Sequence, residues 1–134
     1  ARAVSYAFPP IPRMRNTCIA PGTSTFEEMI ADVEEGVYAV KARGGQAGEM
    51  FTFTAARAYM IRKGKVEELV RNATVSGNLF KTLKNIDMVG NDFEMNEWGG
   101  CGKTRAALYN MQMLSKSGTG GPHVKIENVV IGGR

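Results

Sequence analysis

The chain has 134 residues, of which 43% are hydrophobic and 22% charged, a balance typical of one globular domain with a real core. Its formal net charge is +4, but the lysines and arginines are scattered along the sequence, which argues against a nucleic-acid partner. No apolar run approaches the roughly 20 residues of a membrane span, and two cysteines are too few for a disulfide scaffold. We therefore expect a cytoplasmic protein with no membrane partner.

The first predicted element is a helix that follows an irregular, proline-rich segment over residues 1–22. Ser24 and Glu27 have the spacing of a capping box, with Ser24 as the N-cap. Gly36 is typical of the position after a helix C-terminus. Between these signals one apolar stripe has helical spacing: Phe26, Met29, Ile30 and Val33.

A period of two predicts strands in the middle of the chain. Residues 37–41 read as a strand, and residues 44–46 as the loop that follows it. A second strand is predicted over residues 51–61, where Arg57 interrupts an otherwise apolar face. Lys63-Gly64 is a hairpin turn signal, so residues 66–75 are expected to return as the partner strand.

The last third is predicted to hold a short helix, a loop and a strand. Asn78 is a suitable cap for a helix that carries Leu79, Leu83 and Ile86 on one side. The glycine-rich segment 99–122 is expected to be a mobile loop, and residues 124–131 a strand. Residues 1–134 are thus predicted to be a single strand-rich α+β domain, with an antiparallel sheet or barrel-like arrangement and two short helices.

The candidate functional residue is Cys101, in the run Gly99-Gly100-Cys101-Gly102-Lys103. The glycines remove the side-chain packing that shields a structural cysteine, and Lys103 favours the thiolate form. These neighbours suit a metal ligand or a nucleophile. A small buried residue in a tight turn is the alternative, because free cysteine is among the most buried residue types.

Three known chemistries fit this neighbourhood poorly. Gly102-Lys103-Thr104 resembles the end of a phosphate-binding loop, but Glu97 stands where that motif needs glycine. A thiol–imidazole pair with His123, the only histidine, is neither supported nor excluded by spacing, and we expect His123 to be an exposed residue at a strand start. A zinc site needs three or four protein ligands, and two cysteines and one histidine far apart do not build one.

Short motifs spread over nearly the whole chain resemble, in the same order, the C-terminal region of the TldD/PmbA family. They are Pro9-Pro10-Ile11-Pro12-Arg13-Met14-Arg15-Asn16-Thr17, Pro21-Gly22, Gly44-Gly45-Gln46, Phe51-Thr52-Phe53, Gly64-Lys65, Met88-Val89-Gly90-Asn91-Asp92, Gly100-Cys101-Gly102-Lys103, Pro122 and Val130-Ile131-Gly132-Gly133. Members of this family are zinc metallopeptidases, also called modulators of DNA gyrase.

The resemblance implies a role for Cys101 as a zinc ligand. Active members carry a His-Glu-x-x-x-His helix that supplies two ligands and a glutamate that activates water, and a cysteine from the C-terminal region supplies the third ligand. Cys101 is similar in position to that cysteine, and the family's inactive subunits lack the metal-binding residues, so the resemblance is to a TldD-type subunit. No such helix is present in this chain, so we expect it upstream of Ala1, in a longer protein. Residues 104–119 follow the family pattern only loosely.

The functional hypothesis is therefore the C-terminal domain of a zinc-dependent peptidase that cleaves short or unfolded peptides. Gly100 and Gly102 are expected to let the loop approach zinc and substrate. Relatives form homodimers, or heterodimers with a TldE/PmbA-like subunit, and a similar partner is expected here. The fragment alone is expected to be inactive. The alternative is a non-enzymatic interaction or dimerisation domain in which Cys101 is structural; DNA or gyrase binding rests on the family's older name.

Overall fold

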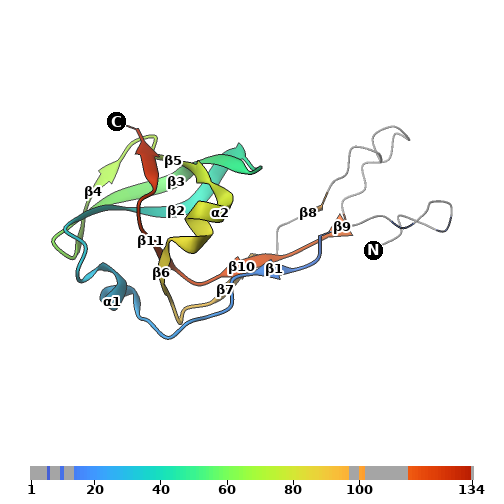
Figure 1. The fold of residues 1–134 in the computed structure, drawn as a ribbon, viewed down its shortest axis with the longest axis horizontal. Helices are drawn as coiled ribbons and strands as arrows, with labels where there is room; N and C mark the ends of the chain where they lie inside the picture. The colour runs from blue at the N-terminus through green and yellow to red at the C-terminus, as the bar shows by residue number, and fades with distance from the viewer. Residues whose placement is uncertain (1–5, 7–9, 11–13, 97–99, 102–114, 134) are drawn as a thin grey trace. The chain divides into compact units, whose positions relative to one another are not determined.

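The computed structural model describes residues 6, 10, 14–96, 100–101 and 115–133, with only the backbone at 100–101 and 115–116 (Figure 1). The chain divides into two compact units, each built from two segments. Unit 1 consists of Ala1–Pro21 and Asp92–Pro122, and unit 2 of Gly22–Asn91 and His123–Arg134. The expectation that 1–134 is a single domain stays a prediction.

Unit 2 is built on a five-stranded antiparallel sheet. Its strands are β2 (Glu35–Gln46), β3 (Met50–Arg62), β4 (Lys65–Val70), β5 (Thr74–Asn78) and β12 (Val130–Gly132). The order is β12, β5, β3, β2, and β4 pairs with β3 beyond the end of β5. The 13-residue β3 is therefore the central strand. The core beside it is made of small side chains: Ala55, Ala58 and Ala73, packed against Val37, Ala39 and Val70.

Two helices and a two-stranded sheet complete unit 2. The helices are α1 (Phe26–Ile30) and α2 (Leu79–Lys84), and the sheet pairs β6 (Ile86–Val89) with β11 (Val124–Ile126). Asn78 caps α2 as predicted, because its Oδ1 accepts the backbone N–H of Lys81 at 3.1 Å. None of the helices in the described part of the chain is long and apolar enough to cross a membrane.

The described residues of unit 1 form short strands and no helix. Its three-stranded sheet has β10 (Thr119–Gly121) in the centre, between β1 (Thr17–Cys18) and β7 (Glu94–Asn96). The β1–β10 pair is parallel and the β10–β7 pair is antiparallel. A separate antiparallel pair joins β8 (Gly100–Cys101) to β9 (Ser115–Lys116). The segment 99–122 was expected to be a mobile loop; this is wrong for its described residues, most of which lie in these strands.

The strand-rich α+β class with two short helices is confirmed, and the antiparallel sheets are not closed into a barrel. The predicted first helix is too long and begins one residue too early. Its N-cap is Thr25, whose hydroxyl accepts the N–H of Glu28 at 3.3 Å while Glu28 accepts the N–H of Thr25 at 2.8 Å. The helix ends at Ile30, and a few residues later the carbonyls of Val33 and Glu34 accept hydrogen bonds from Gly64 and Lys63 in the β3–β4 turn.

Three strand predictions are corrected by the pairing. Residues 44–46 are not a loop, because they pair with residues 52–54 across a bulge in β2. Residues 66–75 are two strands, separated at Asn72, where φ is +54°. Residues 124–131 are likewise divided, at Asn128 with φ of +55°, into strands that join different sheets. The Lys63-Gly64 turn is confirmed, since both residues have the positive φ that a tight hairpin requires.

Candidate functional site

Cys101 lies in β8, at the base of an antiparallel strand pair. Cys101 is opposite Ser115 and Gly100 is opposite Lys116. The predicted substrate contact Gly102 and the neighbouring Lys103 lie outside the described residues, as does the side chain of Cys101. Cys101 therefore lies on a strand of unit 1 and not in a loop.

The segment that follows β9 is attached to the N-terminal motif of the chain. The N–H of Gly118 donates to Asn16 Oδ1 at 2.8 Å, and the N–H of Thr17 donates to the Gly118 carbonyl at 3.0 Å. The N–H of Ile19 donates to the Gly120 carbonyl at 3.0 Å. Asn16 and Thr17 thus bind Gly118, which comes two residues after β9, the partner strand of Cys101.

Gly118 and Gly120, on either side of Thr119, lie close to the Met95 side chain. A Cβ on Gly118 would lie 2.7 Å from the Met95 methyl carbon, and one on Gly120 would lie 2.6 Å from its sulfur. The second cysteine, Cys18, is an exposed free thiol whose Sγ donates to Met95 Sδ at 3.5 Å. Met95 thus lies against both glycines and the Cys18 thiol, and at Gly120 a Cβ would also lie 2.9 Å from the Glu94 carbonyl oxygen.

His123 is not the exposed residue that the sequence suggested. It is half-buried, and its Nε2 is hydrogen-bonded to the Tyr38 hydroxyl at 2.7 Å. The rings of Phe26 and Tyr38 lie 5.1 and 5.5 Å from the imidazole, centre to centre. His123 belongs to unit 2 and Cys101 to unit 1. The pairing of Cys101 and His123 as nucleophile and base stays a hypothesis. The contacts that His123 makes are with the aromatic side chains of Phe26 and Tyr38.

The Val89-Gly90-Asn91 motif is a backbone junction in unit 2. The Gly90 carbonyl accepts the N–H of Gly22 at 2.7 Å, and the Gly90 N–H donates to the His123 carbonyl at 2.8 Å. A Cβ on Gly22 would lie 2.2 Å from the Val89 carbonyl oxygen, so only glycine permits this approach. Sequence reasoning did not find this role, because nothing local shows that residues 22, 90 and 123 meet.

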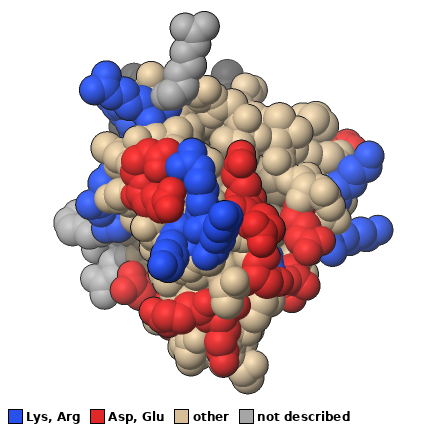
Figure 2. Space-filling view, turned by 90° about the vertical axis from the view of Figure 1, so that its left-hand side faces the viewer, with Lys and Arg blue, Asp and Glu red and all other residues tan. Residues whose placement is uncertain are grey.

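Charged side chains are interleaved on the face of unit 2 in Figure 2, where basic and acidic groups adjoin. Two ion-pair groups of this unit are Arg62 with Glu67 and Glu68, at 3.0 and 2.6 Å, and Lys125 with Asp32 and Asp87, at 2.7 and 3.2 Å. A hydrogen bond from Lys125 lowers the pKa of Asp32 and raises that of Lys125 itself. The viewed face shows no continuous basic surface of the kind that binds nucleic acid.

The described residues do not form a metal site by themselves. Within them, no group of three or more histidine, cysteine, aspartate or glutamate side chains converges. A zinc ion held by protein needs three or four such donors. The role of Cys101 as a zinc ligand stays a prediction.

Comparison with known proteins decides the family. Residues 1–133 match the model of the PmbA/TldA metallopeptidase C-terminal domain. The chain belongs to this family. The match covers both units, so the β8–β9 pair and the junction at Gly90 both lie within the family's domain.

Curated relatives of the PmbA/TldA domain carry metalloprotease names. A metalloprotease of Synechocystis sp. is 46% identical over 99% of this chain and 28% of its own length. One from Methanothermobacter thermautotrophicus is 42% identical over 92% of this chain and 26% of its own length. A zinc metalloprotease TldD homolog of Saccharolobus solfataricus is 36% identical over 99% and 29%. The chain thus spans less than a third of the length of these relatives.

Solved structures share the fold of this PmbA/TldA domain. TldE from Thermococcus kodakarensis has a TM-score of 0.66 at 21% identity, over 87% of this chain and 23% of that one. A protein from Thermotoga maritima named as a modulator of a DNA gyrase has a TM-score of 0.62 at 25% identity, over 86% and 23%.

Proposed function

We propose that the chain is the C-terminal part of a zinc-dependent peptidase and supplies Cys101 as a metal ligand. The proposal is supported chiefly by the relatives that are 46% and 42% identical over more than nine-tenths of this chain and carry the name metalloprotease. The TldD homolog of Saccharolobus solfataricus adds zinc by name. We therefore infer that the full-length protein is a TldD-type subunit.

The chemistry of a thiolate suits the assigned role. Together with two histidines from a His-Glu-x-x-x-His helix elsewhere in the full-length protein, Cys101 would make three protein ligands, which leaves a fourth position of zinc open for water. Zinc bound in this way activates water for peptide hydrolysis. Gly100 and Gly102 on either side of the thiol would allow close approach of the backbone. The chain alone, with one of the ligands, would be inactive.

The structure supports the proposal through the attachment of the cysteine strand. A metal ligand acts best when its backbone is held in place by its surroundings. Cys101 pairs with Ser115 in β9, and Gly118, three residues after Ser115, donates to Asn16, so the partner strand of the cysteine is held by a second part of unit 1. Asn16 and Thr17 of the Arg15-Asn16-Thr17 motif would thus have a structural function, which is to hold the segment after β9 in place.

Short or unfolded peptides are the proposed substrates. An extended peptide presents its backbone for hydrogen bonding and needs little side-chain selectivity. The proposed assembly is a homodimer, or a heterodimer with a TldE/PmbA-like subunit, in the cytoplasm. The shared fold with TldE is consistent with such a pair.

The decisive experiment compares two cysteine variants of the full-length protein that contains this chain. Zinc content and hydrolysis of an unfolded peptide are measured for the wild type, Cys101→Ser and the matched control Cys18→Ser. We expect Cys101→Ser to lose both while its circular dichroism spectrum is unchanged, and Cys18→Ser to keep both. Retention of zinc and activity by Cys101→Ser would instead favour an interaction domain with a structural cysteine.

A further inference from the structure

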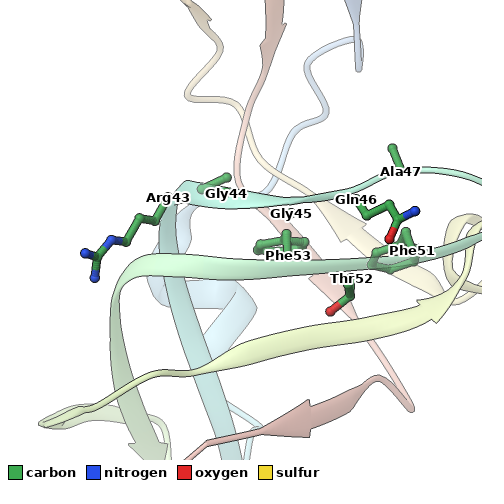
Figure 3. A pocket seen from close by; sticks show the side chains of 9 residues that line it. Arg43, Gly44, Gly45, Gln46, Ala47, Phe51, Thr52 and Phe53 are labelled. Atoms are coloured by element: carbon green, nitrogen blue, oxygen red, sulfur yellow. The ribbon is translucent and has the colours of Figure 1, made fainter.

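A shallow cavity of about 320 Å³ lies between β2 and β3 near the end of their paired ribbon (Figure 3). The family motifs Gly44-Gly45-Gln46 and Phe51-Thr52-Phe53, which the zinc proposal leaves without a role, both line it. The two motifs are adjacent because residues 44–46 pair with residues 52–54 in antiparallel register.

The outer side of β2 is an open strand edge. In the sheet order β12, β5, β3, β2, the last strand pairs with β3 alone among the described residues. A Cβ built on Gly44 would meet no atom within 4 Å, so the space beside this position is free. At Gly45 the opposite holds, because a Cβ there would lie 2.3 Å from the Thr52 carbonyl oxygen. Gly45 therefore permits the close approach of β2 to β3, whereas the open edge of β2 follows from the strand order among the described residues.

Two aromatic rings provide an apolar surface in the cavity. Phe51 and Phe53 are half-buried, and their rings are stacked with centroids 6.3 Å apart and planes inclined by 17°. Such a pair offers a large, rigid contact area for an apolar side chain. Nothing described in unit 2 covers these rings completely, since both keep part of their surface exposed.

Arg43 gives the cavity one charged end. Among the described residues it is the only charged one that lines the cavity, and its side chain extends away from Gly44 at one end of the site (Figure 3). Arg43 is exposed and has no ion pair within the described residues. Glu49, in the connection between β2 and β3, accepts a hydrogen bond from Asn78. An incoming carboxylate would therefore complement Arg43 with two parallel hydrogen bonds.

We propose that this site binds the C-terminal end of an extended apolar peptide, with the terminal carboxylate on Arg43. The peptide adds to the edge of β2 in antiparallel direction, which places its C-terminus at the Arg43 end because β2 runs from Arg43 towards Gln46. An apolar side chain packs on Phe51 and Phe53. This assignment rests on the proposed peptidase function, since it names the peptide end that such an enzyme would hold.

The test is a binding measurement in the absence of turnover. A short peptide of alanine, valine and phenylalanine, labelled with fluorescein at its N-terminus, is titrated with the full-length protein after zinc removal, and fluorescence anisotropy is recorded. The free-acid and C-terminal amide forms are compared for the wild type, Arg43→Gln and the matched control Arg57→Gln. Arg57 is an exposed arginine of the same ribbon that does not line the cavity.

We expect the wild type and Arg57→Gln to bind the free acid about tenfold more tightly than the amide, the value of one charge-assisted contact. Arg43→Gln should bind both forms equally weakly. Equal binding of the two forms by the wild type, or full affinity in Arg43→Gln, would overturn the proposal. Because zinc is absent, these outcomes are independent of the Cys101→Ser experiment, which tests the peptidase assignment alone.

Discussion

The Tyr38 hydroxyl and His123 Nε2 are hydrogen-bonded at 2.7 Å, although 85 residues separate them in the chain. The bond joins the long strand β2 to the residue just before β11. The His123 carbonyl in turn accepts the N–H of Gly90. The aromatic cluster and the backbone junction therefore share one residue.

Removal of this hydrogen bond should destabilise unit 2. We expect Tyr38→Phe to lower the free energy of unfolding by about 1 kcal/mol, the usual net value of a partly buried hydrogen bond. Tyr59→Phe is the matched control, because the Tyr59 ring stacks on Tyr38 at 6.2 Å but its hydroxyl has no hydrogen bond within the described residues. Urea unfolding followed by circular dichroism measures both, and equal losses would contradict the assignment.

A methyl group at Gly22 should disturb the junction at Val89 and Gly90. Since the new Cβ would lie 2.2 Å from the Val89 carbonyl oxygen, we expect Gly22→Ala to destabilise the fold by about 2 kcal/mol or more. Gly44→Ala, where the Cβ meets no atom within 4 Å, should be neutral or slightly stabilising. Thermal unfolding midpoints distinguish the two, and a midpoint unchanged in Gly22→Ala would show that the junction rearranges freely.

The Asp32–Lys125 pair should contribute stability that depends on pH. A hydrogen bond from Lys125 lowers the pKa of Asp32 below its ordinary value of 3.8. The folded state therefore favours the charged carboxylate, and the stabilisation is present above 3.8 and is lost as pH falls through the lower folded value. Asp32→Asn should be less stable than the wild type at neutral pH, and the difference should disappear in strong acid.

Urea midpoints measured across this pH range check that prediction. Glu127→Gln serves as the control, because Glu127 makes no ion pair within the described residues, and it should not show the same pH-dependent difference. At alkaline pH the group that titrates is Lys125, whose pKa is raised above its ordinary value of 10.5. Its contribution to the free energy of unfolding is therefore complete below pH 10.5 and is lost as the pH rises through the higher pKa of the folded state. A constant difference between Asp32→Asn and wild type at all pH values would contradict the assignment.

The Asn16 side chain should protect the Gly118 amide from hydrogen exchange. Asn16→Ala removes the acceptor at 2.8 Å, and we expect exchange at Gly118 to accelerate about tenfold, equivalent to roughly 1.4 kcal/mol. Asn16→Asp keeps an oxygen at the same position and should preserve the protection. Exchange measured by nuclear magnetic resonance would refute the role of Asn16 if the alanine variant exchanged no faster than the wild type.

Local signals in the sequence predicted the elements that depend on neighbouring residues. The Lys63-Gly64 turn and the Asn78 cap follow from backbone preferences within a few positions, and both are confirmed. The predicted end of α1 was wrong: the segment after Ile30 is not helical, and its Val33 and Glu34 carbonyls accept hydrogen bonds from a turn about thirty residues later. The two-strand divisions at Asn72 and Asn128 were missed, since both depend on which distant strand is available as a partner.

The candidate site shows the same division between local and distant information. The glycines around Cys101 indicated an unusual thiol, and the ordered motifs indicated the family, which the comparison confirms. The role of Asn16 could not be predicted, because its partner Gly118 is 102 residues away in sequence. The aromatic contacts of His123 were missed for the same reason, since Phe26 and Tyr38 come from other elements.

The parallel pairing of β1 with β10 has a consequence for synthesis on the ribosome. Thr17 is synthesised long before Thr119, its partner in the register. The β2–β3 hairpin can pair as soon as Arg62 has left the exit tunnel. Thr17 and Cys18 keep unpaired amides and an exposed thiol until Thr119 and Gly120 have been synthesised. A nascent chain halted before Thr119 would therefore carry a folded β2–β3 ribbon and an unpaired β1 segment that chaperones could bind.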